Sequence, residues 1–176
     1  MNWTRSDTRA LFEAARDVPH ITRGAVRVVR RHAAEDGLIE RMARFERFCA
    51  ATDPLPHAWG TSDCSILVAD WVQENGHPDP AAHLRGTYGS EPECGALLAR
   101  HGGLLPLFKT CMEERAGLRA ILEPRFGAVA IIGSSHNEGR QWAAIWNGYR
   151  WMVKWGDATK ARWTPFAARP LGMWAV

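Results

Sequence analysis

Apolar residues in the first third of the chain recur at the three- and four-residue spacing of a helix. The spacing holds over residues 11–18 and over residues 25–32, which Pro19 divides, and again over residues 38–48. Pro54 ends the last of these, because proline lacks the N–H that a helix interior needs. We therefore predict a helical N-terminal extension over residues 1–36 and a compact domain over residues 37–176.

A second helical pattern begins close to Cys64. Gly60 permits a turn, Ser62 or Asp63 can accept hydrogen bonds as the N-cap, and residues 66–72 supply an apolar face. We therefore expect Cys64 at the N-terminus of a helix, with Asp63 acting as a cap and not as a catalytic group.

Two more helices are predicted before the pattern changes. Ser90 can cap a helix that holds Pro92 in its first turn and ends at Gly102-Gly103. A third helix is predicted over residues 105–115. After this point the apolar period changes from about 3.6 residues to 2, which indicates strands.

The last third of the chain has the alternating pattern of a β-sheet. Asn147-Gly148 is its strongest hairpin signal, and a further turn is predicted at Gly156-Asp157. The predicted strands cover residues 128–132, 141–146, 149–155, 160–163 and 171–176. Helices followed by an antiparallel meander indicate an α+β fold, with the helices packed on one face of the sheet.

Tryptophan is frequent in the predicted sheet. The chain has nine tryptophans, and six of them fall in this region: Trp142, Trp146, Trp151, Trp155, Trp163 and Trp174. Along residues 149–155, alternation puts the aromatic residues on one face and Arg150, Met152 and Lys154 on the other. One of these two faces must belong to the core.

Length and composition exclude several classes of protein. None of the apolar runs among the 176 residues approaches the roughly 20 residues of a membrane span, and the first ten residues lack a signal-peptide core. A chain of this length can bury a core without disulfides. Its four cysteines form no CxxC pair, so we expect neither a disulfide framework nor a metal or cofactor site.

The basic character of the chain is confined to its start. The formal net charge is +3, and residues 1–35 supply that excess with seven arginines against four acidic residues. This segment could contact a protein partner, a phosphate or its own domain, although a solvated helix face is the commonest arrangement. Nucleic acid is not an expected partner, because no aromatic residues interleave the arginines.

Among the four cysteines, Cys64 has the position of a nucleophile. A helix N-terminus favours a thiolate through its unpaired N–H groups and its dipole, whereas the carboxylate of Asp63 opposes thiolate formation. Cys49, Cys94 and Cys111 are interpreted as small packing residues.

The stretch Trp59-Gly60-Thr61-Ser62-Asp63-Cys64-Ser65 resembles the nucleophile motif of NlpC/P60 cysteine peptidases, whose papain-like core packs a cysteine-bearing helix against an antiparallel sheet that bears histidine. Four further features resemble the DUF6950-type branch of phages and prophages: Asp79-Pro80-Ala81-Ala82, Arg85-Gly86-Thr87-Tyr88, the helix stop at Gly102-Gly103 and the closing Met173-Trp174-Ala175-Val176. That branch is similar to cell-wall peptidases encoded with the tail genes of phages and gene transfer agents. The resemblance covers residues 38–176.

The resemblance implies that Cys64 attacks an amide carbonyl of peptidoglycan while a histidine acts as general base and a third polar group orients it. In active members that histidine opens the second core strand. The matching segment here, 141–146, contains none, and Trp142 lies at or beside the expected place. The usual Gly-Asp before the first core strand is changed to Gly127-Ala128.

Other histidines are candidates for the missing base. His136, in the loop five residues before Gln141, is the best placed, and His57, seven residues before Cys64, is the second candidate. Either ring would have to come within about 3 Å of the thiol to take its proton. Arg85 and Tyr88 could bind a substrate carboxylate, although a loop-to-core hydrogen bond is their commoner role.

Two hypotheses follow. In the first, the chain is a structural virion protein of a phage tail or tail tip with a degenerate catalytic site, assembled with other tail proteins. In the second, it is an active peptidoglycan hydrolase that uses Cys64 with His136 or His57 to open the cell wall during DNA entry. In both, the protein is made in the host cytoplasm without a signal peptide, and peptidoglycan is the further ligand.

Overall fold

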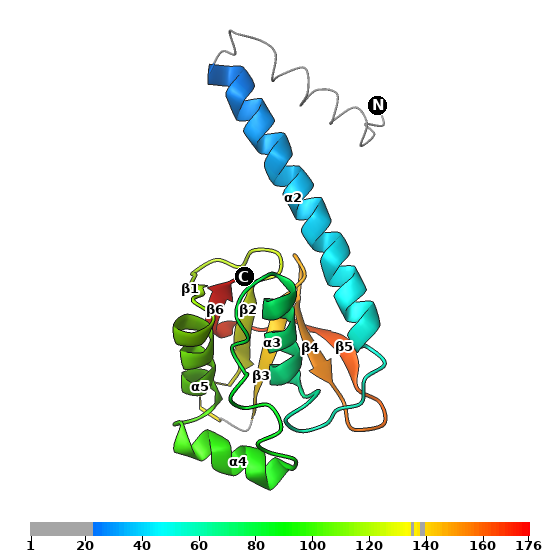
Figure 1. Ribbon diagram of the computed structural model, residues 1–176, viewed down its shortest axis with the longest axis vertical. Helices are drawn as coiled ribbons and strands as arrows, with labels where there is room; N and C mark the ends of the chain where they lie inside the picture. Colours follow the sequence, from blue (N-terminus) through cyan, green and yellow to red (C-terminus); the bar gives the residue numbers. More distant parts are fainter. Residues whose placement is uncertain (1–22, 135, 138–139) are drawn as a thin grey trace. The chain divides into compact units, whose positions relative to one another are not determined.

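The computed structural model describes residues 23–134, 136–137 and 140–176, with side chains from residue 37 onward (Figure 1). The predicted helical pattern within residues 1–22 lies outside this part of the chain. The chain divides into two compact units, Met1–Ala43 and Arg44–Val176. Helix α2 (Arg23–Thr52) runs through residue 36, where the boundary between the extension and the compact domain was predicted. That the extension is a separate part of the chain stays a prediction.

The helices of the second unit follow the predicted order. α2 ends at Thr52, just before the proline that was expected to stop it. After it come α3 (Cys64–Glu74), α4 (Glu91–Arg100), α5 (Leu104–Thr110) and the π-helical turn η1 (Cys111–Arg115). Within the described chain, no helix combines the length and the hydropathy that crossing a bilayer requires.

The strands form one sheet in which every neighbouring pair is antiparallel. They are β1 (Arg119–Ala120), β2 (Val129–Gly133), β3 (Gln141–Trp146), β4 (Trp151–Trp155), β5 (Arg162–Phe166) and β6 (Pro170–Ala175), in the spatial order β1-β6-β2-β3-β4-β5. Helices packed on an antiparallel sheet confirm the α+β class.

The predicted meander is right from β2 to β5 and wrong for β6, which returns to pair with β2. Two residues explain this placement. Pro165 lies in β5, and proline is tolerated on an edge strand because it cannot donate a ladder hydrogen bond. Trp174 of β6 is only 2% exposed, and β6 has a strand on each side.

The hairpin between β3 and β4 is present, but its connection is longer than the Asn-Gly dipeptide predicts. Residues 147–150 form a four-residue loop, closed by a bond from Asn147 N–H to the carbonyl of Arg150. The side-chain oxygen of Asn147 also accepts the N–H groups of Tyr149 and Arg150. β4 therefore begins at Trp151, and the predicted start at Tyr149 was wrong.

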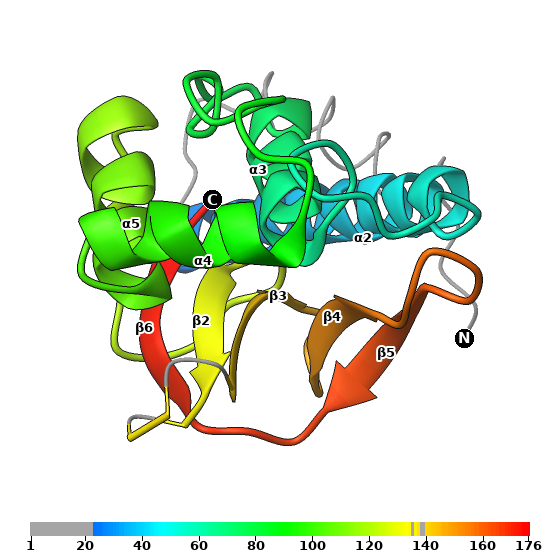
Figure 2. The same ribbon diagram turned by 90° about the horizontal axis from the view of Figure 1, so that it is seen from below.

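The two faces of the sheet are packed differently, with α3, α4 and α5 on the same side of it (Figure 2). The helices lie on one face, as predicted, where Val68, Trp71 and Val72 of α3 pack on Val129 and Ile145. The opposite face carries aromatic rings that pack on one another, namely Trp142, Trp146, Trp151, Trp155 and Phe166. The six sheet tryptophans all lie in strands, as predicted.

The end of α2 is held by β4 and β5. The ammonium group of Lys154 donates hydrogen bonds to the carbonyls of Thr52 at 2.9 Å and Asp53 at 2.7 Å. The indole N–H of Trp163 donates to the hydroxyl of Thr52 at 2.8 Å. Lys154 is therefore buried, and β4 buries residues on both of its faces instead of exposing one.

Candidate functional site

Asp63 fixes the start of α3. Its Oδ1 accepts hydrogen bonds from the backbone N–H groups of Ser65 and Ile66, at 3.0 Å each. Its Oδ2 accepts from the N–H of Gly60 at 2.8 Å and from the hydroxyl of Tyr88 at 2.7 Å. This carboxylate is 3% exposed and both of its oxygens are occupied, so it acts as the predicted cap.

Gly60 lets the chain approach the loop that carries Tyr88. Its φ of +71° lies in the left-handed region, and a Cβ at this position would lie 2.3 Å from the carbonyl oxygen of Tyr88. The carbonyl of Gly60 accepts the N–H of Gly86 at 3.0 Å. Gly60 and Asp63, which precede Cys64 in the motif, therefore have structural roles that do not depend on catalysis.

Arg85 joins its loop to the core instead of facing an open site. Its Nε lies 2.7 Å from Oδ2 of Asp79, and its Nη2 lies 2.7 Å from Oδ1 of Asp70. Tyr88 is engaged with Asp63. The loop-to-core interpretation of Arg85 and Tyr88 is confirmed.

Cys64 is the first residue of α3 and is partly buried. Its Sγ interacts with the backbone of Ala143 in β3 and lies 4.0 Å from the hydroxyl of Ser65. Burial, followed by the negative charge of Asp63, raises the pKa of the thiol from 9.0 to about 11. At neutral pH Cys64 is therefore a protonated thiol, despite its place at a helix N-terminus.

The strand beside the thiol begins with residues that cannot act as a base. Gln141 shares the helix-facing side of β3 with Ala143, and its Nε2 donates to the carbonyl of Ser134 at 3.0 Å. Trp142 alternates to the opposite face, where its ring meets Trp155 edge-on at 5.0 Å. At the start of β3 the helix-facing side therefore carries the amide of Gln141 and the methyl group of Ala143, and the indole of Trp142 lies on the other side.

The contacts of the two candidate histidines are with other residues. His136 is in an exposed bend between β2 and β3, with its N–H donating to the hydroxyl of Ser134 at 3.2 Å. The ring of His57 packs edge-on against Trp59, with centroids 4.7 Å apart. Among the residues that the structure describes, no hydrogen bond or ring contact joins either histidine to Cys64.

The other cysteines are packing residues, as predicted. Cys111 belongs to the core, while Cys49 and Cys94 are partly buried against it. Burial is the main cause that raises the pKa of Cys49 to about 12 and those of Cys94 and Cys111 to about 11.

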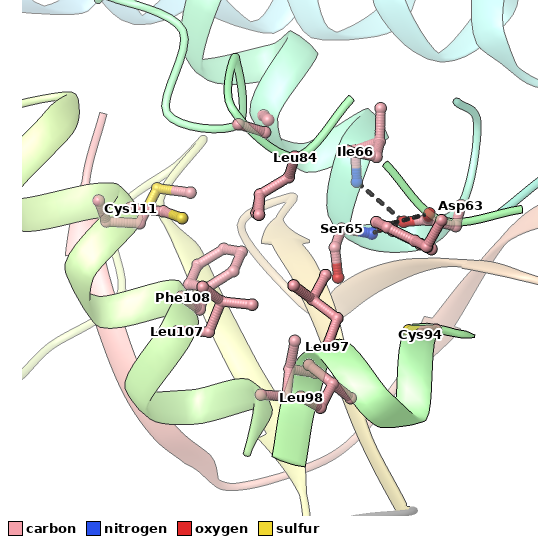
Figure 3. Close-up of a pocket in the computed structure, with 15 residues that line it drawn as sticks. Asp63, Ser65, Ile66, Leu84, Cys94, Leu97, Leu98, Leu107, Phe108 and Cys111 are labelled. Atoms are coloured by element: carbon pink, nitrogen blue, oxygen red, sulfur yellow. Dashed lines mark hydrogen bonds between the residues drawn. The ribbon is translucent and has the colours of Figure 1, made fainter. Parts of the chain in front are cut away.

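A small cavity lies next to Asp63, between α3, α4 and α5 (Figure 3). Leucines and Phe108 supply much of its wall, and its volume is about 50 Å³. Ligand pockets measure roughly 300–1,000 Å³, so this cavity is a packing gap and not a substrate site. In the described part of the chain, no three His, Cys, Asp or Glu side chains gather closely enough to hold a metal ion.

A family model matches residues 38–168 of the chain, and it is described as a domain of unknown function (DUF6950). The matched span contains α3, the loop with Arg85 and Tyr88, and strands β1 to β5, and it ends before β6. No curated protein and no solved structure matches the chain.

Proposed function

The chain belongs to the DUF6950 family, and on that premise we propose that it is a structural protein of a phage tail or tail tip. In this proposal its domain keeps the papain-like fold of an NlpC/P60 cysteine peptidase, while the catalytic apparatus is degenerate. The expected partners are other tail proteins.

The environment of Cys64 carries the proposal. Burial and Asp63 keep its thiol protonated, with a pKa of about 11. The strand that the thiol meets opens with Gln141 and Trp142, and neither an amide nor an indole accepts a proton at neutral pH. A cysteine peptidase needs a thiolate and a histidine within reach. The raised pKa of Cys64 opposes the thiolate, and the contacts that the structure shows for His136 and His57 within the described residues are with Ser134 and Trp59.

Two features support the relation to NlpC/P60 peptidases. The helix that begins with Cys64 packs on an antiparallel sheet, which is the arrangement of a papain-like core. The thiol also faces β3, the strand that corresponds to the histidine-bearing strand in active members. The tail assignment rests on the sequence resemblance to peptidases encoded with tail genes.

The test is a digestion of purified peptidoglycan, followed by mass analysis of the released fragments. We expect the wild-type protein to release no more cleaved stem peptides than Cys64→Ala, because the wild-type thiol is not ionised. A known muramidase serves as the positive control for the substrate. If the wild-type protein cleaved stem-peptide amides and Cys64→Ala did not, the chain would be the active hydrolase of the second hypothesis.

A further inference from the structure

The part of α2 that belongs to the first unit carries exposed apolar side chains. α2 (labelled in Figure 1) begins at Arg23, and the first unit ends at Ala43. Leu38, Ile39 and Met42 are 43%, 53% and 41% exposed. A helix in a protein gains most of its stability from the packing of its apolar face. This stretch of α2 therefore offers an apolar surface to a partner.

Ile39 and Met42 belong to a regular series of positions. Six positions from 25 to 42 are separated alternately by three and four residues, which is the heptad spacing of helices that wrap around each other. These six positions share one face of α2, which we call the seam: Ala25, Val28, His32, Glu35, Ile39 and Met42. The two polar residues lie at the centre of the seam, and the apolar residues lie toward its ends.

The charges of the same stretch are segregated along the helix. Residues 23–31 include four arginines and no acidic residue, whereas residues 32–40 include three acidic residues and no lysine or arginine. Two parallel copies of this helix would place like charges level with each other. Two antiparallel copies would place the basic stretch of each level with the acidic stretch of the other, and opposite charges attract. The stretch is therefore complementary to a second copy of itself.

The polar centre of the seam favours the same orientation. In an antiparallel pair centred between residues 33 and 34, position 25 lies opposite 42, position 28 opposite 39 and position 32 opposite 35. Apolar positions then meet apolar positions, and His32 of each copy meets Glu35 of the other. A parallel pair would instead bring the two copies of Glu35 together, and neighbouring carboxylates repel. Polar pairs inside a seam also fix its register.

We propose that the protein forms a homodimer in which residues 25–42 of α2 pair antiparallel with the same residues of a second copy. Each copy contributes the same surface, as in the two-fold symmetric dimers that are commonest among soluble oligomers. Val28 of each copy lies against Ile39 of the other. This interaction surface does not depend on the proposed loss of catalysis.

Sedimentation velocity of the full-length protein over a concentration series measures the dimer. The seam variant is Ile39→Asp, and the matched control is Leu122→Asp, which makes the same kind of change at a residue that is 95% exposed and lies outside α2. We expect Ile39→Asp to weaken the dimer about a hundredfold or more, because a symmetric dimer carries the change twice. The control variant should dimerise like the wild type.

Two charge variants test the complementarity of the basic and acidic stretches. They are Arg27→Glu/Arg30→Glu/Arg31→Glu and Glu35→Lys/Asp36→Lys/Glu40→Lys. Each variant gives the whole stretch one sign of charge, so each should be monomeric alone. A mixture of the two should form a heterodimer, and this rescue also shows that both variants are folded.

Cysteine cross-linking tests the orientation. Val28→Cys and Ile39→Cys are oxidised separately and as a mixture, with the wild type as the background for the native cysteines. We expect a covalent dimer in the mixture and little from either variant alone, because the antiparallel pair places position 28 opposite position 39. A parallel pair would link each variant to itself.

Three results would overturn the proposal. The first is a wild-type protein that stays monomeric at every concentration. The second is equal association of Ile39→Asp, Leu122→Asp and the wild type. The third is cross-linking of Val28→Cys to itself as efficiently as to Ile39→Cys.

Discussion

Asp63 stabilises the turn before α3 and disfavours the thiolate of the residue that follows it. Its four hydrogen bonds tie together the helix start, Gly60 and Tyr88. Its negative charge, together with burial, raises the pKa of Cys64. Selection for this fold can therefore retain Asp63 next to Cys64 without any selection for catalysis.

Gly60→Ala is expected to destabilise the fold by at least about 1 kcal/mol more than Gly76→Ala. Both glycines have positive φ, but a Cβ at Gly60 would meet the carbonyl of Tyr88 at 2.3 Å, whereas a Cβ at Gly76 has nothing within 4 Å. The free energy of unfolding in urea measures both effects. Equal losses in the two variants would contradict the close approach of Gly60 to the Tyr88 loop.

Local sequence predicted part of this site. The cap by Asp63 and the place of Cys64 follow from residues that are neighbours in the chain. The bond from Tyr88 to Asp63 joins residues 25 positions apart, so spacing alone could not predict it. The outward turn of Trp142 depends on the sheet register, which a single sequence does not fix.

At the scale of elements, the β4–β5 hairpin holds the C-terminus of α2. A helix leaves its last carbonyls without partners, and the ammonium of Lys154 binds the carbonyls of Thr52 and Asp53 there. A cation at this end also interacts favourably with the helix dipole. Burial removes water from the ammonium group, and this lowers the pKa of Lys154.

Lys154→Met is expected to lower the free energy of unfolding by about 1–3 kcal/mol, because two carbonyls lose their donor while the cost of burying an ammonium also disappears. Lys160→Met, at an exposed position, is the control and should change stability by less than about 0.5 kcal/mol. Urea unfolding at neutral pH measures both. If Lys154→Met left the free energy of unfolding unchanged, the contact of Lys154 with the carbonyls of Thr52 and Asp53 would not stabilise the fold.

The pattern predicted which elements exist better than how they pair. Helix ends at Pro54 and Gly102-Gly103 follow from local chemistry, and the structure has them. The place of β6 beside β2 and the four-residue loop after β3 depend on contacts between distant segments. Alternation placed Lys154 on the face opposite the aromatic residues without saying whether that face is buried, and its tertiary partners bury it.

At the scale of the whole molecule, the four cysteines share a raised pKa. Each thiol stays neutral in the folded protein above the ordinary value of 9.0, with values of about 11 or 12. In the unfolded chain they ionise near that ordinary value. The folded state therefore holds more protons than the unfolded state in alkaline solution.

Stability is expected to fall as the pH rises from 9 toward 11, and to be insensitive to the thiols below 9. A fully buried thiol contributes a slope of up to about 1.4 kcal/mol per pH unit, and solvent screening reduces it for partly exposed thiols. Lys154, with its lowered pKa, acts in the opposite direction. Urea unfolding across this range measures how the free energy of unfolding changes with pH, and Cys94→Ala should make that change smaller. A free energy of unfolding that does not change between about pH 9 and 11 would contradict the raised pKa values of the buried thiols.

The central claim is that the Cys64 thiol is not activated, and its alkylation by iodoacetamide as a function of pH tests this most directly. The rate at Cys64 is followed by mass analysis of its proteolytic peptide. We predict slow modification at neutral pH and a rate that rises with an apparent pKa of about 11. A rate that reaches its plateau below about pH 8, faster than that of a free thiol, would contradict the account.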